Sequence, residues 1–269
     1  MNTAVIGWDR TVLELKMYFR EKEAVFFSFI FPILMLSMFS VIFGDEFGAG
    51  EPGAADVSAA RFFLPGMVAA GVMLTSFQSM ALSVAVERDD GTLKRLRSTP
   101  MPPVAYFLGK IGLVAITSLA QFALLIAVAR LGFGVQLPTD PARWGTFVWV
   151  FLLGVASGTV LGIAYSSLAS SSRSVGAIVI APTLILQFIS GVYFAFTDLP
   201  EWLKQVASIF PLKWIAQGMR SVFFPDDWQG AEMASTWEHG RTALVLAAWL
   251  VAGLLVCART FRWTKRGTT

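Results

Sequence analysis

Charge and reactive side chains are scarce in this chain of 269 residues. Only 14% of the residues are charged, where a soluble domain carries roughly 25%. The single cysteine, Cys257, excludes an intrachain disulfide and a metal–thiolate cluster. The single histidine, His239, lies outside the long apolar runs, so no serine–histidine or histidine–metal group is expected at membrane depth. These absences argue against a soluble domain and against an intramembrane enzyme.

Long apolar runs are what the chain has instead. A helix needs about 20 apolar residues to span a bilayer. Six runs have that character: residues 25–43, 62–86, 104–129, 145–168, 175–196 and 242–258. A seventh stretch, 202–224, is interrupted by Lys204, Pro211, Lys213 and Arg220, which favours short re-entrant or interfacial helices. The predicted fold class is an all-α integral membrane protein with six transmembrane helices.

We expect a single transmembrane domain over residues 1–269. It comprises an interfacial helix (1–24), spans one to five (25–196), an extracellular loop with short helices (197–241), span six (242–260) and a cytoplasmic tail (261–269). With six spans, 14 of the 21 lysines and arginines fall in the termini and in the second and fourth loops. Because cytoplasmic loops are rich in these residues, both termini are predicted to be cytoplasmic, in the plasma (inner) membrane.

The first 24 residues have the pattern of an amphipathic helix. Val5, Trp8 and Val12 recur at helical spacing, and charged residues such as Arg10 and Glu14 mostly occupy the other side. Two roles fit this pattern. The helix is either a simple membrane anchor or a lever that contacts a cytoplasmic partner.

Groups that could supply energy are missing from the spans. Lys110 and Arg130 lie only at the ends of the third span, where we expect them to snorkel to the headgroups. A phosphate-binding loop would need glycine at Val104, six residues before Lys110 in the only Gly-Lys pair. The chain therefore has no ATPase motif of its own, and any active transport would depend on another subunit.

A densely charged segment separates the second and third spans. It reads "ERDDGTLKRLRSTPMPP" from Glu87 to Pro103. Gly91 allows a turn, Thr92 is predicted to cap a short helix over residues 93–98, and prolines from Pro100 onward end that helix. One interpretation is a topogenic loop that only fixes orientation.

Small and polar residues mark contacts between the spans. Gly154, Gly158 and Gly162 form a small-xxx-small pattern that allows another helix to approach closely. We expect packing within one subunit, with a dimer contact as the alternative. Uncharged polar residues in the second and fifth spans either bond neighbouring helices or line a pathway for a neutral or amphipathic solute.

Three features give the chain a resemblance to a known family. The first is "ERDDGTLKRLRSTPMPPVAYFLGK", and the second is "SGVYFAFTDLPEWLKQVASIFPLKWIAQGMRSVFF" at residues 190–224. The third is the layout of an amphipathic start, six spans and a large fifth loop. Together they resemble the permease subunits of ABC-2 type exporters, and most of all the daunorubicin-efflux kind of drug-resistance permease. One departure is Ala195, where family members often have proline.

The resemblance implies a half-transporter that exports a hydrophobic or amphipathic solute such as a drug, an antibiotic or a lipid. Its partners would be a second permease copy or a paralogous permease, two separate ATPase subunits and the bilayer, with no nucleic acid. ATP and Mg would bind to the ATPase, and this chain would bind no cofactor or metal. The alternatives are a membrane scaffold that recruits a partner without transporting and, less supported, an integral membrane enzyme.

Site residues follow from the same resemblance. The implied ATPase-coupling residues are Glu87, Arg88, Gly91, Thr92, Leu93, Lys94, Arg95, Leu96, Arg97 and Pro100. The implied solute-pathway residues are Met73, Phe77, Gln78, Gln187 and Phe188. The implied extracellular re-entrant residues are Pro200, Trp202, Leu203, Pro211 and Arg220.

Overall fold

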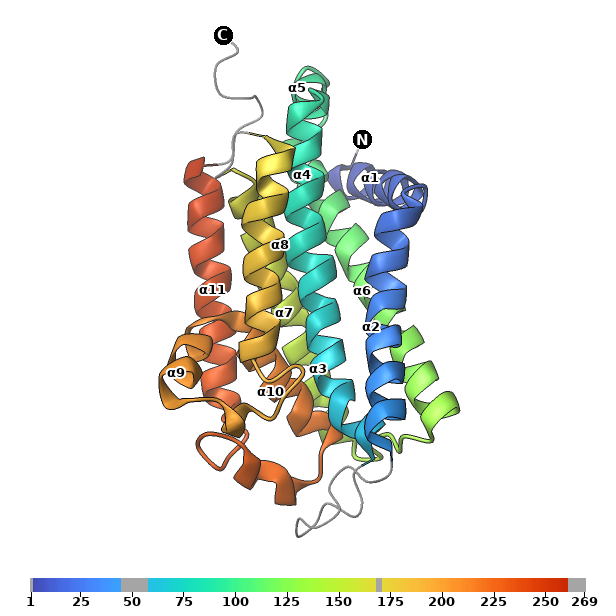
Figure 1. Ribbon diagram of the computed structural model, residues 1–269. Coiled ribbons are helices and arrows are strands. Elements are labelled where there is room, and N and C mark those ends of the chain that lie inside the picture. Colours follow the sequence, from blue (N-terminus) through green and yellow to red (C-terminus); the bar gives the residue numbers. More distant parts are fainter. Residues whose placement is uncertain (1, 45–57, 168–170, 261–269) are drawn as a thin grey trace.

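The computed structural model describes residues 2–44, 58–167 and 171–260, and within these ranges the chain is helical with no strand (Figure 1). The α-helices are α1 (Thr3–Tyr18), α2 (Lys22–Phe43), α3 (Ala59–Met73), α4 (Ser79–Asp89), α5 (Thr92–Arg97), α6 (Pro103–Phe133), α7 (Pro141–Ser166), α8 (Ser172–Ile189), α9 (Glu201–Ile209), α10 (Pro211–Phe223) and α11 (His239–Thr260). A π-helix, η3 (Leu74–Gln78), joins α3 to α4, and short 3₁₀ turns are η4 (Phe196–Asp198) and η5 (Asp226–Ala231). The all-α prediction is confirmed. The predicted tail, 261–269, lies outside the described residues.

Five segments are long and apolar enough to cross a membrane: α2, the continuous α3–η3–α4 segment, α6, α7 and α11. They correspond to five of the six predicted spans. The predicted fifth span, 175–196, extends seven residues past the end of its helix, because α8 ends at Ile189. The chain turns there through Gly191, whose φ of +73° favours glycine. α8 is therefore a shorter apolar helix beside the five long ones.

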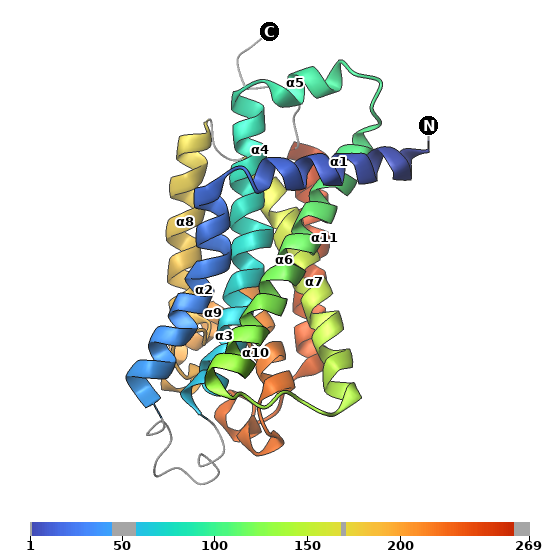
Figure 2. The ribbon, with the colours of Figure 1, turned by 90° about the vertical axis from the view of Figure 1, so that its right-hand side faces the viewer.

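The long helices run roughly along one axis, with the short helices at its two ends (Figures 1 and 2). α1 lies across the bundle at one end and α5 projects from the same end, which we call the α5 end. α9, α10 and η5 lie at the opposite end, the α10 end.

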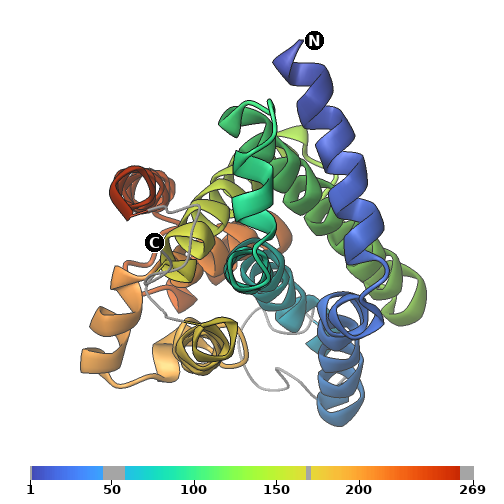
Figure 3. The ribbon, with the colours of Figure 1, turned by 90° about the horizontal axis from the view of Figure 1, so that it is seen from above.

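Burial separates central helices from peripheral ones. In the most apolar 18-residue stretch of each segment, 72% of the residues are buried in α3–η3–α4 and 67% in α7, but only 22% in α2 and 17% in α11. Seen from the α5 end, α4 stands among α2, α6, α7 and α8 (Figure 3). Helix α5 thus extends from the best-packed segment, α3–η3–α4.

The N-terminal helix is shorter than predicted, and the face that it buries is the polar one. α1 ends at Tyr18, and α2 begins at Lys22 after a short break. Trp8 is 61% exposed, whereas Arg10 is 7% exposed and Glu14 is 3% exposed. The expected apolar stripe is therefore the outer face of α1, and its charged face packs on α6.

Candidate functional site

A glycine and an aspartate immediately precede helix α5. Gly91 has a φ of +77°, which lets the chain turn away from α4. The backbone N–H of Thr92 then donates to Oδ1 of Asp90 at 2.8 Å. The prediction that Thr92 caps this helix is wrong, because Thr92 is its first helical residue and the side-chain oxygen comes from Asp90.

The end of α5 is set by hydroxyl groups and prolines. The hydroxyls of Ser98 and Thr99 donate to the carbonyls of Arg95 and Leu96, at 2.7 and 2.6 Å. Prolines follow, and Pro103 is the first residue of α6, a position that suits its fixed φ. The predicted short helix between two spans is thus present, displaced by one residue.

The two faces of α5 differ in burial. Leu93 is fully buried, and Leu96 is half-buried against the core. Of the ten predicted coupling residues, four are exposed: Lys94, Arg95, Arg97 and Pro100. α5 is therefore held by its leucines and presents a basic face outward.

Glu87 is also among the predicted coupling residues, but it lies inside the protein. It is 5% exposed and accepts from Lys110 Nζ at 2.7 Å. The same ammonium donates to Oε2 of Glu14 at 2.8 Å. Lys110 is 0% exposed, so the expectation that it snorkels to the headgroups is wrong. Glu87 is unavailable for contact with a partner.

Arg10 completes a neutral group of four charges, the buried ion cluster of Arg10, Glu14, Glu87 and Lys110. Arg10 Nη2 lies 2.5 Å from Glu14 Oε1 and 3.5 Å from Glu87 Oε1. Tyr106 donates its hydroxyl to Glu87 Oε2 at 2.8 Å. The cluster joins α1, α4 and α6, and these helices all reach the end of the bundle from which α5 projects (Figure 2). Two cations and two carboxylates offset one another, as burial of charge requires.

Glycines let α1 lie close enough to α6 for these contacts. A Cβ added at Gly109 would overlap the Arg10 side chain, and one added at Gly112 would overlap Thr11. The Gly-Lys pair that fails as a phosphate-binding loop thus has a structural role. The usable sequence signal was the opposite charge pair Arg10–Glu14, four residues apart on one helical face.

Arg88 points to a different neighbour. Its guanidinium donates to the carbonyl of Ser166, to Ser166 Oγ at 3.1 Å and to Ser167 Oγ at 3.3 Å. It therefore links the end of α4 to the end of α7. Beyond the undescribed residues 168–170, Ser171 and Ser174 form a capping box at the start of α8.

The five solute-pathway candidates are in different environments. Met73 is 3% exposed and Phe77 is 8% exposed, with the Phe77 ring packed edge-on against Tyr165. Gln78 is half-buried. Gln187 is buried and accepts from the Tyr193 hydroxyl at 2.6 Å, and only Phe188 is exposed, at 46%. In this subunit, Met73 and Phe77 are core residues rather than surface residues.

Two glycines of α7, Gly158 and Gly162, face the π-helix. A Cβ at Gly158 would overlap the Ser76 side chain, and one at Gly162 would lie 2.6 Å from the carbonyl oxygen of Phe77. The expected packing within one subunit is confirmed. The neighbouring hydroxyl of Thr75 is paired with Ser118 Oγ at 2.6 Å, so polar groups here bond adjacent helices.

The α10 end contains the predicted re-entrant residues. Pro200 precedes α9, Trp202 and Leu203 lie in its first turn, Pro211 begins α10, and Arg220 lies near the end of α10. Trp202 is 66% exposed, whereas Pro211 and Arg220 are buried. Arg220 binds both carboxylate oxygens of Glu232, at 2.5 and 3.0 Å, and donates to the Gly191 carbonyl at 3.0 Å. The bidentate pair ties α10 to the end of η5, and the bond to Gly191 ties α10 to the turn after α8.

Sequence reasoning missed a second buried cation at this end. Lys213 is 1% exposed, donates to Gln217, and lies 3.9 Å from Glu238 Oε2. Its ammonium also lies 3.6 Å from the centre of the Trp214 ring. Burial lowers the pKa of Lys213 to about 8, and the nearby Glu232 and Glu238 carboxylates offset part of that effect.

A serine and the histidine do meet at the α10 end. His239 Nε2 lies 2.9 Å from Ser221 Oγ, which itself donates to the Gly218 carbonyl at 2.7 Å. Among the described residues, no hydrogen bond joins the other ring nitrogen to a carboxylate. The pair therefore lacks the third group that orients a catalytic histidine. Nor do the described residues include a group of three or more metal-ligating side chains.

Fold and site together define a multi-pass helical membrane protein. At one end, its basic helix α5 is held in place by its leucines. The sequence model of the ABC-2 type transporter family matches residues 10–224, and the chain belongs to that family. This range includes the buried ion cluster, α5 and α10.

Several transport permeases are similar to the chain over about 70% of its length. The inner membrane transport permease YadH of Escherichia coli is 23% identical over 195 residues, covering 71% of this chain and 73% of that protein. The probable multidrug ABC transporter permease YbhR of Escherichia coli is 25% identical over 193 residues, covering 70% of this chain and 49% of that protein. The putative transport permease ycf38 of Porphyra purpurea is 24% identical over 210 residues, covering 72% and 70%. The chain is thus a membrane permease of the ABC-2 type.

Proposed function

We propose that this permease exports a hydrophobic or amphipathic solute, and that a separate ATPase subunit supplies the energy by binding α5. The proposal rests on one observation: α5 exposes a basic face and is anchored in the protein by a buried leucine. Lys94, Arg95 and Arg97 face outward, while Leu93 is fully buried. On this proposal the α5 end faces the cytoplasm, in agreement with the distribution of basic residues.

The contacts beneath α5 suggest how movement of the ATPase would reach the spans. The turn before α5 ends α4, and α4 is joined to α1 and α6 through Glu87 and to α7 through Arg88. A displacement of α5 would therefore act on four helices at once instead of being absorbed by a flexible loop. ATP and Mg bind to the ATPase subunit on this account, and the permease binds neither. The proposed transporter contains two permeases and two ATPases, as the family resemblance implies.

The test is a double charge reversal on the exposed face. Arg95→Glu with Arg97→Glu is expected to reduce solute-stimulated ATP hydrolysis by the reconstituted complex at least tenfold, because like charges at an interface cost several kcal/mol. Membrane insertion and thermal stability should not change, since both side chains are exposed. The matched control is Arg130→Glu, an exposed arginine at the end of α6 away from α5.

Two outcomes would contradict the proposal. Full coupling in the double variant would reduce α5 to a topogenic segment. An associated ATPase whose activity responds to none of a panel of drugs and lipids would favour the alternative of a scaffold that recruits a partner without transport.

A further inference from the structure

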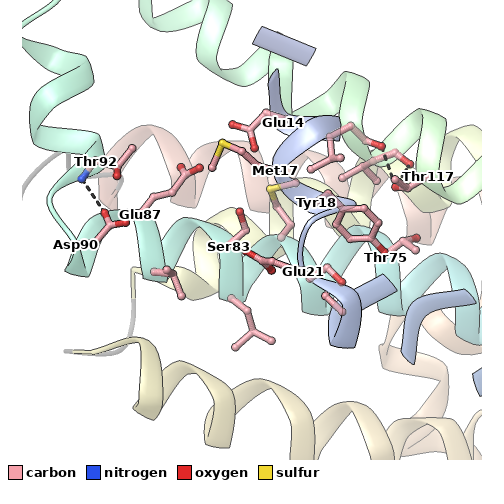
Figure 4. Close-up of a pocket in the computed structure, with 17 residues that line it drawn as sticks. Glu14, Met17, Tyr18, Glu21, Thr75, Ser83, Glu87, Asp90, Thr92 and Thr117 are labelled. Atoms are coloured by element: carbon pink, nitrogen blue, oxygen red, sulfur yellow. Dashed lines mark hydrogen bonds between the residues drawn. The ribbon is translucent and has the colours of Figure 1, made fainter. Parts of the chain in front are cut away.

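A cavity of about 280 Å³ lies between α1, the start of α2, α4 and α6 in the half of the molecule nearest α5 (Figure 4). The cavity is open to the surface, because Met17, Glu21 and Asp90 in its lining are exposed. Glu87 and Ser83 reach the cavity from α4, and Glu14 and Met17 reach it from α1.

The charge of the cavity lining has one sign. Four carboxylates line it, those of Glu14, Glu21, Glu87 and Asp90, and no lysine, arginine or histidine does. Lys110 and Arg10 bind Glu14 and Glu87 from outside the lining. Among the described residues, Glu21 and Asp90 form no salt bridge, although Asp90 accepts from the Thr92 amide. Two carboxylates therefore remain for an incoming cation.

The rest of the lining combines hydroxyl groups with apolar side chains. Met80, Leu113 and Val114 are buried side chains of α4 and α6 that form part of the wall. A mainly apolar pocket with a few convergent polar groups is the usual form of a small-molecule site. Because the lining combines carboxylates with apolar side chains, it matches a ligand with a hydrocarbon or aryl body and a positive head.

We propose that this cavity binds an amphipathic cation, such as an aryl or alkyl ammonium. The site lies within one subunit. The proposal deepens the export function argued above by naming a class of solute, and the binding itself does not require the ATPase.

Photolabelling of the full chain in lipid nanodiscs tests the site. The probe is a photoreactive benzyltrimethylammonium ion, and its control is the uncharged analogue with a tert-butyl group in place of the trimethylammonium. The cation is expected to label cavity residues such as Met17 and Met80, and to do so more strongly than the analogue. Equal labelling by both probes, or labelling confined to the outer faces of α2 and α11, would overturn the proposal.

Variants sharpen the result. Glu21→Gln with Asp90→Asn keeps an oxygen for the Thr92 amide and should weaken labelling by the cation about tenfold, with no effect on the analogue. Ala24→Phe places a ring in the cavity and should abolish specific labelling by both probes. Glu201→Gln, at the α10 end, should change neither. Unaltered cation labelling in the first variant, or in the second, would refute the site.

The outcomes separate this proposal from the proposed function. Cavity labelling by the cation, without solute-stimulated hydrolysis in the complex, supports the site and contradicts export. Coupled hydrolysis with no labelling of the cavity contradicts the site and leaves export intact.

Discussion

At the scale of single residues, the molecule depends on charges that hydropathy alone would leave at the surface. Lys110 is fully buried between Glu14 and Glu87 and also donates to Ser83 at 2.8 Å. Charges taken out of water are tolerable only when they are paired and hydrogen-bonded. Removal of one member would leave the others without compensation, so the cluster is a sensitive point of the fold.

Lys110→Met is expected to reduce the free energy of unfolding by about 3–5 kcal/mol, because it leaves a net buried negative charge. The same change at exposed Lys94 should alter it by less than about 0.5 kcal/mol. Thermal unfolding of both variants in one detergent gives the comparison. Equal melting temperatures for the two would show that the cluster contributes nothing to stability.

Lys213 predicts a pH dependence. Its pKa in the folded protein is about 8, below the ordinary value of 10.5, so the folded chain holds this proton less tightly than the unfolded chain. The burial penalty is present below pH 8 and disappears as the pH rises to 10.5. The wild type should therefore gain up to about 3 kcal/mol over this window relative to Lys213→Met. Melting temperatures at several pH values measure the difference, and parallel curves for the two proteins would contradict the assignment.

At the scale of helices, close approach between segments depends on glycine. α7 meets the π-helix of the central span where Gly158 and Gly162 leave room for Ser76 and the Phe77 carbonyl. A π-helix widens one turn and frees backbone groups, and here the neighbouring helix packs directly on that turn. The glycine pattern therefore serves packing within the subunit.

Gly162→Ala should reduce the free energy of unfolding by about 1–3 kcal/mol, since the added methyl group would lie 2.6 Å from a backbone oxygen that cannot move independently. Gly145→Ala in the same helix is the control, because no atom lies within 4 Å of the added Cβ. Thermal unfolding distinguishes them. Because alanine favours a helix more than glycine does, Gly145→Ala should not lower stability, and an equal loss at both positions would show that the contact at Gly162 is not responsible.

Much of this architecture could be predicted from hydropathy and local chemistry. Five spans and the short helix after Gly91 were predicted within a few residues, since each depends on the residues of its own segment. The ion cluster could not be, because Glu14, Glu87 and Lys110 are far apart in sequence and each alone looks like an interfacial charge. The early end of α8 was also missed, because residues 190–196 are apolar although the chain turns at Gly191.

At the scale of the whole molecule, the two ends differ in how their charged side chains are placed. The α10 end is tied internally, through Arg220 to Glu232 and through Arg143 to Asp226. The α5 end buries one neutral cluster and leaves Lys94, Arg95 and Arg97 exposed. This asymmetry is why we place the ATPase at α5 and an acidic, cation-binding cavity directly beneath it.

Site-specific cross-linking measures the position of the ATPase most directly. In a Cys257→Ala background, single cysteines at Arg95, at Arg97 and, as the control, at Glu201 are treated with a short thiol-to-amine cross-linker in the assembled complex. The account predicts a permease–ATPase product from the two α5 positions, with altered yield when ATP is bound, and none from the α9 position. A product from Glu201 alone, or from none of the three, would contradict it.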